Sequence, residues 1–376
     1  MDIIIDILAN LFDFILYYLL PFVVVLGIMI FFHELGHFLV AKSFKVKVLK
    51  FALGFGPKLV GKTVGETEYS IRYFPLGGFV KMLGEEIEEE EEIDLSPEDQ
   101  ERAFSNQHVL KRIAIVSAGP MFNLLLALFL FCGLFFFAGM QVMTPEIGQV
   151  SAGSPAQRAG LLKGDLIMTM QGQRIERWSD IKRLVREGAG QPLHVTVRRD
   201  GKLFSTTVVP EQGVVKNEFG EEIKTPLIGI VAAGKIKKIE LGAGRALTEG
   251  IRETWKWIKL TLLVIYKLLQ GVVSIKTIGG PILIGQMAGQ IAQESFSYLI
   301  PFMGIITVNL GILNLFPIPI LDGGLILFLL IELLMGKPLS LKAREWAQKV
   351  GLGLLVLLML IVTYNDLARL SRKLLW

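Results

Sequence analysis

The sequence HELGH at residues 33–37 holds three side chains that can do chemistry together. Residues four apart share one face of a helix, so His33 and His37 can both turn an imidazole toward one Zn²⁺ ion. Glu34 would then sit beside the open coordination position as the base of a zinc hydrolase. Plain interhelical hydrogen bonding is the alternative for the two histidines. Residues 14–32 are uncharged and about long enough to cross a bilayer. Because ionisable side chains in a membrane are costly and usually functional, we favour the metal site.

A third ligand is expected in the stretch NLGILNLFPIPILDGG at residues 309–324. Pro317 and Pro319 cannot occupy a regular helix interior, so this apolar span must be interrupted. An interrupted span is tolerated where it lines a cavity, which would bring water to the bond being cut. Asp322 follows the break, and Gly323-Gly324 would let the backbone pass close to an ion. Two histidines, one carboxylate and an open fourth position are typical of catalytic zinc. A helix cap is the alternative role for Asp322.

Composition predicts a membrane protein. Of the 376 residues 52% are apolar, and the net charge of +4 is spread along the chain without a basic stripe, so nucleic acid is not an expected partner. The single cysteine, Cys132, rules out a disulfide framework. Acidic residues at 2, 6 and 13 argue against a cleaved signal peptide. Lysines at 42, 45, 47 and 50 place the end of the first span that carries His33 on the cytoplasmic side.

The fold class that follows is a multi-pass α-helical membrane protein with about four transmembrane helices, a membrane-associated β-hairpin region and an inserted α/β domain. Its expected segments are a first span carrying HELGH (1–43), a β-loop with an acidic cytoplasmic loop (44–112), a second span (113–141), a small mixed domain (142–234), an amphipathic interfacial segment (235–295), a third, broken span (296–334), and a cytoplasmic loop with a fourth span and tail (335–376).

We expect different roles for the two loops between the first and second spans. The short strands within residues 44–83 are rich in aromatic residues, so they would dip into the membrane against the first helix. A strand edge near the metal would hold a substrate peptide extended, and a plain structural hairpin is the equal alternative. The acidic run at 85–94 is expected to be a solvated loop without chemistry. Asn123 in the second span is expected to pack between helices or to orient a substrate carbonyl.

The mixed domain contains SPAQRAGLLKGDLI at residues 154–167, which resembles the signature stretch of bacterial PDZ domains. Ser154-Pro155 predicts a capped helix that Gly160 closes, and Asp200-Gly201 predicts a hairpin turn. Domains of this kind bind extended peptides by strand addition. The resemblance implies that residues 227–230 form the edge of a peptide groove, whose ligands would be PDZ-binding peptides or trimmed substrate termini.

The chain resembles the site-2 protease family of intramembrane zinc metalloproteases. The features that carry the resemblance, in chain order, are HELGH, the glycine-rich stretches at 54–56 and 75–78, the segment 119–123, one PDZ domain and NLFPIPILDGG. The likeness covers nearly the whole chain and is to the bacterial branch that cleaves membrane-bound anti-sigma factors. It implies that His33, His37 and Asp322 bind Zn²⁺ and that Glu34 is the catalytic base.

The same resemblance implies that Asn314 helps to hold the substrate, with Asn309 and Asn123 as further candidates. The partners would be the lipid bilayer and transmembrane segments already cut outside the membrane. The protein would lie in the bacterial inner membrane, its active site near the cytoplasmic side and its PDZ domain outside the cytoplasm. Some members carry two PDZ domains, whereas this chain has room for one. A secondary transporter with broken helices and a PDZ scaffold with a vestigial metal site are the alternatives.

Overall fold

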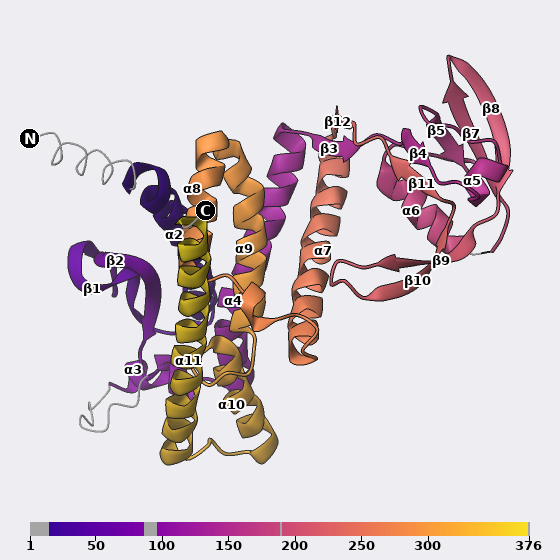
Figure 1. The fold of residues 1–376 in the computed structure, drawn as a ribbon. Helices are drawn as coiled ribbons and strands as arrows, with labels where there is room; N and C mark the ends of the chain where they lie inside the picture. Colours follow the sequence, from indigo (N-terminus) through magenta and orange to yellow (C-terminus); the bar gives the residue numbers. More distant parts are fainter. Residues whose placement is uncertain (1–14, 86–95, 189, 375–376) are drawn as a thin grey trace, which may run out of the picture. The chain divides into compact units, whose positions relative to one another are not determined.

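The computed structural model describes residues 15–85, 96–188 and 190–374 (Figure 1). The expectations for the amino-terminal acidic residues and for most of the acidic run at 85–94 fall outside these residues. The chain divides into two compact units. The first unit comprises the residues up to 134 and from 247 onward, and the second comprises residues 135–246.

The first unit is built mainly of helices. Its long helices are α2 (Leu20–Ser43, after a π-helical turn at Ile15–Leu19), α4 (Val109–Phe137), α7 (Ala243–Leu269), α9 (Leu299–Asn314) and α11 (Leu341–Leu374). The shorter ones are α3 (Pro97–Arg102), α8 (Pro281–Glu294), α10 (Asp322–Met335) and 3₁₀ turns at Phe104–Asn106, Ile275–Thr277 and Phe296–Tyr298.

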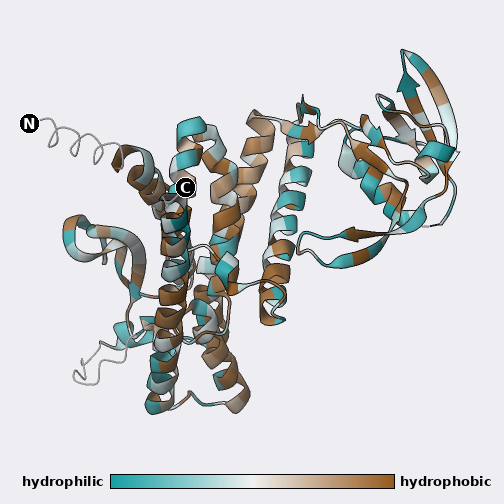
Figure 2. Ribbon diagram, in the orientation of Figure 1, coloured by the Kyte–Doolittle hydropathy of each residue, from teal (hydrophilic) through white to brown (hydrophobic). Residues whose placement is uncertain are grey.

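Four helical stretches of the described chain are long and apolar enough to cross a membrane. They are Ile15–Ser43, Val109–Phe137, Phe296–Asn314 and Leu341–Arg372. Figure 2 shows hydrophobic colour along α9 and the middle of α11. The expected third span is interrupted, because α9 ends at Asn314 and α10 begins only at Asp322. The last helix is continuous over Leu341–Leu374 and so extends well beyond its apolar centre.

Residues 48–82 form a bent sheet that is larger than the expected hairpin. Its strands β1 (Val48–Val64) and β2 (Thr67–Met82) each fold into two segments. Residues 48–53 pair with 78–82, residues 50–53 also pair with 68–71, and residues 58–64 pair with 67–72. The order across the sheet is therefore 78–82, 48–53, 67–72, 58–64, with residues 78–82 at one edge. Large apolar side chains such as Val60 and Phe74 are exposed on the far part of the sheet. An apolar surface of this kind is suited to contact with lipid or another protein.

Two apolar clusters hold the first unit together. One joins the end of α2 to the sheet, the start of α4 and Leu329 of α10, with Ala41, Val48 and Ile115 fully buried. The other joins α2 to α8 and α9 through residues such as Met29. Both clusters include α2, so α2 is the helix against which the other elements are fixed.

The second unit contains a four-stranded sheet in the order β6-β5-β7-β8 and three two-stranded ladders. Its strands are β3 (Met140–Met143), β4 (Ile147–Val150), β5 (Leu166–Met170), β6 (Gln173–Arg174), β7 (Leu193–Arg199), β8 (Lys202–Val208), β9 (Glu211–Lys216), β10 (Glu222–Leu227), β11 (Ile230–Ala232) and β12 (Ile236–Ile239). β3 pairs with β12, β4 with β11, and β9 with β10.

Two helices complete the second unit and contribute to its own core. α5 (Pro155–Arg158) is capped by Ser154, whose side chain accepts from the Gln157 N–H, as the sequence predicts. α6 (Trp178–Glu187) begins after Arg177 rather than after a Ser, Thr, Asp or Asn cap. The reason is that the Asp180 carboxylate accepts the Arg177 N–H at 3.1 Å and so satisfies the helix start itself.

Candidate metal centre

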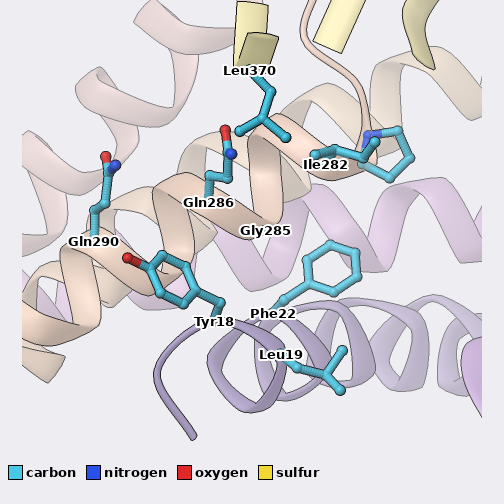
Figure 3. Close-up of a pocket in the computed structure, with 9 residues that line it drawn as sticks. Tyr18, Leu19, Phe22, Ile282, Gly285, Gln286, Gln290 and Leu370 are labelled. Atoms are coloured by element: carbon cyan, nitrogen blue, oxygen red, sulfur yellow. The ribbon is translucent and has the colours of Figure 1, made fainter. Parts of the chain in front are cut away.

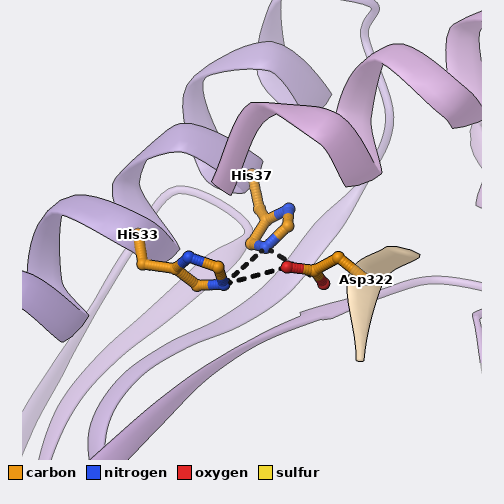
Figure 4. A group of neighbouring side chains, drawn as sticks. All are labelled: His33, His37 and Asp322. Atoms are coloured by element: carbon orange, nitrogen blue, oxygen red, sulfur yellow. Dashed lines mark hydrogen bonds and ion pairs between the residues drawn. The ribbon is translucent and has the colours of Figure 1, made fainter. Parts of the chain in front are cut away.

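Three ligand-type side chains converge at the end of α2 (Figure 4). His33 and His37 extend from successive turns of α2, and Asp322 reaches them from the first turn of α10. The two Nε2 atoms lie 3.3 Å apart. Asp322 Oδ2 lies 3.2 Å from His33 Nε2, and Oδ1 lies 3.7 Å from His37 Nε2. The side chains of all three residues are largely shielded from solvent.

The hydrogen bonds behind the two imidazoles fix which nitrogens face the cluster. His37 Nδ1 lies 2.9 Å from the Ile115 carbonyl, which can only accept, so Nδ1 carries the proton and Nε2 presents a lone pair. His33 Nδ1 lies 3.2 Å from the side-chain nitrogen Nδ2 of Asn123. If the amide is turned over, its oxygen accepts the Nδ1–H and leaves Nε2 of His33 free to bind a metal.

The donor set fits a divalent cation. Asp322 Oδ2 is buried and accepts no hydrogen bond from a described residue. Lone pairs of two imidazoles and a carboxylate that face one another repel unless positive charge lies between them. Two nitrogens and one carboxylate oxygen are ligands that Zn²⁺ prefers, and ring N–H groups held from behind are the usual support of such ligands.

Glycines bring α2 and α4 into close contact at this level. A Cβ on Gly119 would overlap the His37 ring, and a Cβ on Gly36 would overlap the Ala118 carbonyl. Pro120 stands inside α4 and has no N–H to give to the preceding turn. The turn of α4 next to His37 is thus free of side chains that would fill the space of the imidazole.

The break between α9 and α10 folds back on itself to present Asp322. A Cβ on Gly323 would meet the carbonyls of Leu315 and Phe316, and one on Gly324 would meet the Ile318 carbonyl. The tight turn therefore requires both glycines, whether or not an ion lies nearby. Asp322 is not the helix cap, because Leu321 occupies that position without a side-chain bond.

A second acidic residue anchors the other end of α10. Glu332 receives hydrogen bonds from both terminal nitrogens of Arg112, which lies at the start of α4. The two side chains are 14% and 12% exposed. This buried ion pair joins the helix that carries Asp322 to the helix that supports both imidazoles. The sequence indicated Arg112 only as the end of a span, since nothing in its spacing links it to a residue 220 positions away.

Glu34 lies between the cluster and the sheet edge. A Cβ on Gly78 would come within 2.9 Å of its Cγ. The backbone of Val80 also lies beside its carboxylate. The edge segment 78–82 pairs with residues 48–53, and no other described strand pairs with its outer side, so Glu34 packs against an edge strand of the sheet.

The three asparagines are placed differently. Asn123 is fully buried behind His33. Asn309 accepts a 2.6 Å hydrogen bond from Thr261 of α7. Asn314 is the last residue of α9 and is partly exposed at the break. Only Asn123 contacts one of the three converging side chains.

Two further features of the first unit lie away from the cluster. A cavity of about 580 Å³ is lined by the start of α2, by α8 and by Leu370 (Figure 3). It contains Tyr18, Gln286 and Gln290, and no acid, histidine or cysteine is among its described lining residues. Tyr18 precedes His33 by roughly 22 Å of helix, so this cavity is not part of the cluster.

At the carboxyl end of α2, beyond HELGH, Glu66 fastens the turn between β1 and β2. Arg102 and Lys42 donate to its carboxylate at 2.6 and 2.7 Å. These two hydrogen bonds lower the pKa of Glu66 from 4.5 to about 2. The turn is thereby held against the end of the helix that carries HELGH.

Comparison with known proteins identifies the class of the chain. Residues 21–358 match the model of Peptidase family M50. The zinc metalloprotease RasP of Geobacillus kaustophilus is 31% identical, over 93% of this chain and 98% of that protein. Proteins of Agrobacterium fabrum and Brucella suis, which carry the provisional name zinc metalloprotease, are 34% and 36% identical over 94% and 93% of this chain and 96% and 94% of their own lengths.

Among solved structures, the PDZ domain of an SdrC-like protein from Listeria monocytogenes matches 23% of this chain and 84% of its own, at 19% identity and a TM-score of 0.19. The family match extends across α2, α4 and α10, the helices that bring the two histidines, Glu34 and Asp322 together. The chain belongs to Peptidase family M50 and is a site-2-type zinc metalloprotease of bacterial membranes.

Proposed function

We propose that His33, His37 and Asp322 bind the catalytic Zn²⁺ and that the protein hydrolyses peptide bonds within transmembrane segments. The substrates would be membrane proteins already cut outside the membrane, such as anti-sigma factors, or remnants of signal peptides. The observation that carries this proposal is the convergence of three lone-pair donors, beside Glu34, at the end of a helix apolar enough to span a membrane.

The mechanism assigns the proton transfers to Glu34. Zn²⁺ held by the three ligands supplies a Lewis acid that polarises the peptide carbonyl and lowers the pKa of water to about 7. The Glu34 carboxylate takes a proton from the attacking water and then delivers it to the departing amide nitrogen. The backbone of Val80 beside the carboxylate would help to keep it oriented during this exchange.

The free edge at residues 78–82 supplies a means of holding the substrate. A peptide bond inside a helix is shielded by the hydrogen bonds of that helix, so the segment must unwind before it is attacked. Main-chain pairing with an exposed strand edge stabilises the extended form. The contact of Gly78 with Glu34 supports this role, because a peptide added to that edge would run beside the base. Asn314, at the break of the third span, would contact the same peptide.

The orientation in the membrane follows from charge. Lysines at 42, 45, 47 and 50 follow the HELGH end of α2, which favours the cytoplasmic side for the catalytic residues. α4 begins near the same side with Lys111 and Arg112, so the PDZ-like second unit after it would lie outside the cytoplasm. Arg369, Arg372 and Lys373 near the carboxyl end then run against the positive-inside bias. In that position the PDZ-like unit would exclude substrates that keep a bulky outer domain.

The test is cleavage of a panel of membrane-anchored stubs by the purified chain in proteoliposomes, with and without a zinc chelator. The native chain should cleave stubs whose outer domain has been removed, and Glu34→Gln should not. Cleavage at the native rate by Glu34→Gln would refute the proposed role of the base. Equal cleavage of trimmed and untrimmed stubs would refute the requirement for a prior cut.

A further inference from the structure

The second unit contains a groove with an unbalanced charge. A cavity of about 470 Å³ lies between α6 and the chain from Thr225 to Ile230. Its floor is apolar, formed by Trp178, Ile181 and Ile228 of the core. Three cations line it, and no acidic residue is found among its described lining residues. An apolar floor with cations on its rim fits an extended, acidic ligand.

One side of the groove is a strand edge that can accept a further strand. The Ser151 N–H donates to the Gly229 carbonyl at 2.9 Å, so Ile230 and Val150 form a non-hydrogen-bonded antiparallel pair. The N–H and C=O of Ile230 therefore point away from β4. The Ile228 carbonyl accepts a hydrogen bond from the Ala156 N–H. The Gly229 N–H belongs to the same trans peptide as that carbonyl, so it points away from Ala156. β11 pairs only with β4 among the described residues.

The cations that matter lie on α6. Lys182 and Arg186 are four residues apart, so they share one exposed face of the helix, and neither has an ion-pair partner in the described part of the chain. Their neighbour Arg183, which does not line the groove, is paired with Glu187 at 3.1 Å. The third cation, Lys216, stands opposite Glu222 in the β9–β10 hairpin, so its charge is partly offset. Like charges at this helical spacing repel, and an anionic ligand would relieve that repulsion.

We infer that this groove selects extended peptides with acidic side chains, which pair with Lys182 and Arg186 while the peptide backbone adds to the edge of β11. Alternate side chains of an added strand point to the same side, so an acidic residue at every second position can face α6. This inference deepens the proposed function, because it names the chemistry by which the PDZ-like unit would recognise its protein ligands. It concerns binding alone and does not depend on cleavage.

The experiment measures peptide binding by the full-length Glu34→Gln chain in detergent. Short fluorescein-labelled peptides carry Glu, Gln or Lys at two alternate positions, and fluorescence anisotropy gives each Kd. We expect the Glu peptide to bind about three- to tenfold more tightly than the Gln peptide, as two partly exposed ion pairs allow, with the difference shrinking in high salt.

Charge variants assign the preference to the groove. Lys182→Glu with Arg186→Glu should reverse the order of the Glu and Lys peptides, and Lys182→Gln with Arg186→Gln should abolish it. Arg183→Glu is the matched control, since it reverses a neighbouring charge outside the groove and should leave the order unchanged.

Equal Kd values for the Glu and Gln peptides, or an unchanged preference in the double Glu variant, would overturn the inference. Vesicles containing anionic lipid provide the second arm. Binding of these vesicles that is lost in the double variant, without any peptide preference, would identify a membrane-facing patch and also overturn it. Because no arm requires proteolysis, a failed inference is distinguishable from a failed proposal about cleavage.

Discussion

Asn123 provides the sharpest test of the centre, because two roles for it predict different measurements. As a substrate-binding residue it would affect cleavage and leave zinc binding intact. As the residue behind His33 it would affect zinc binding first. Its side chain is fully buried and lies 3.2 Å from His33 Nδ1, which favours the second role. We expect Asn123→Leu to weaken zinc binding.

The magnitude follows from the hydrogen bond that is lost. When zinc occupies Nε2 of His33, the amide oxygen of Asn123 would turn to accept the Nδ1–H; leucine cannot do so, and the buried donor would be left unpaired at a cost of about 1–3 kcal/mol. That cost corresponds to a roughly 5- to 150-fold loss of affinity, and loss of a partner behind a zinc ligand typically costs 10–100-fold. Asn123→Asp should bind zinc close to the native affinity, because a carboxylate can accept the same proton.

The assay is competition for zinc against a chelator of known affinity, with the bound metal measured by atomic absorption. Asn309→Leu is the matched control, since it removes a partly buried side-chain amide that is bonded to Thr261 rather than to a proposed metal ligand. Thermal unfolding in excess chelator, where zinc makes no contribution, reports any packing defect separately. Native zinc affinity in Asn123→Leu, together with reduced cleavage, would refute the positioning role and restore the substrate-binding one.

Three other outcomes follow from the described contacts. Glu34→Gln should keep zinc, measured by metal analysis, while the cleavage rate falls by about 10²–10⁴-fold; loss of zinc would contradict a role as base alone. Gly119→Val should abolish zinc binding, because even its Cβ would overlap the His37 imidazole. Gly133→Val in the same helix should not, because a Cβ there meets no atom within 4 Å; equal metal content in the two variants would contradict this packing. Because the pKa of Glu66 is lowered to about 2, its carboxylate adds stability that is present above about pH 4.5 and is lost as the pH falls toward 2. Glu66→Gln should flatten the dependence of the unfolding midpoint on pH in that window, and an unchanged slope would mean that the bond to Arg102 has no effect on stability.

Much of the centre could be predicted from the sequence because its residue types are rare in apolar segments. HELGH carries its own helical spacing, so the shared face of His33 and His37 follows from the helix period alone. The break at Pro317 and Pro319 is likewise local, since proline cannot continue a helix. The choice of Asp322 as third ligand required only that the broken span pack against the first. The expected turn at Asp200-Gly201 is present between β7 and β8 for the same local reason.

The residues that support the centre could not be predicted in this way. The Ile115 carbonyl is a backbone group, which no side-chain pattern reveals. Asn123 had two interpretations, and only its packing against His33 separates them. The pairing of Arg112 with Glu332 does not follow from the sequence, because ion pairs between distant segments carry no spacing signal. The two-way pairing of residues 48–53 was also missed, since an alternating strand pattern does not specify how many neighbours a strand has.

The sequence by itself determined the proposed ligand types, the break that precedes Asp322 and the membrane class of the chain, since each depends on residues close together or on composition. The tertiary structure decided which glycine faces which ring, which backbone groups fix the two imidazoles, and which strand edge holds Glu34. These are contacts between segments 44 to 90 residues apart, and they are set by close packing in three dimensions rather than by any local preference of the chain.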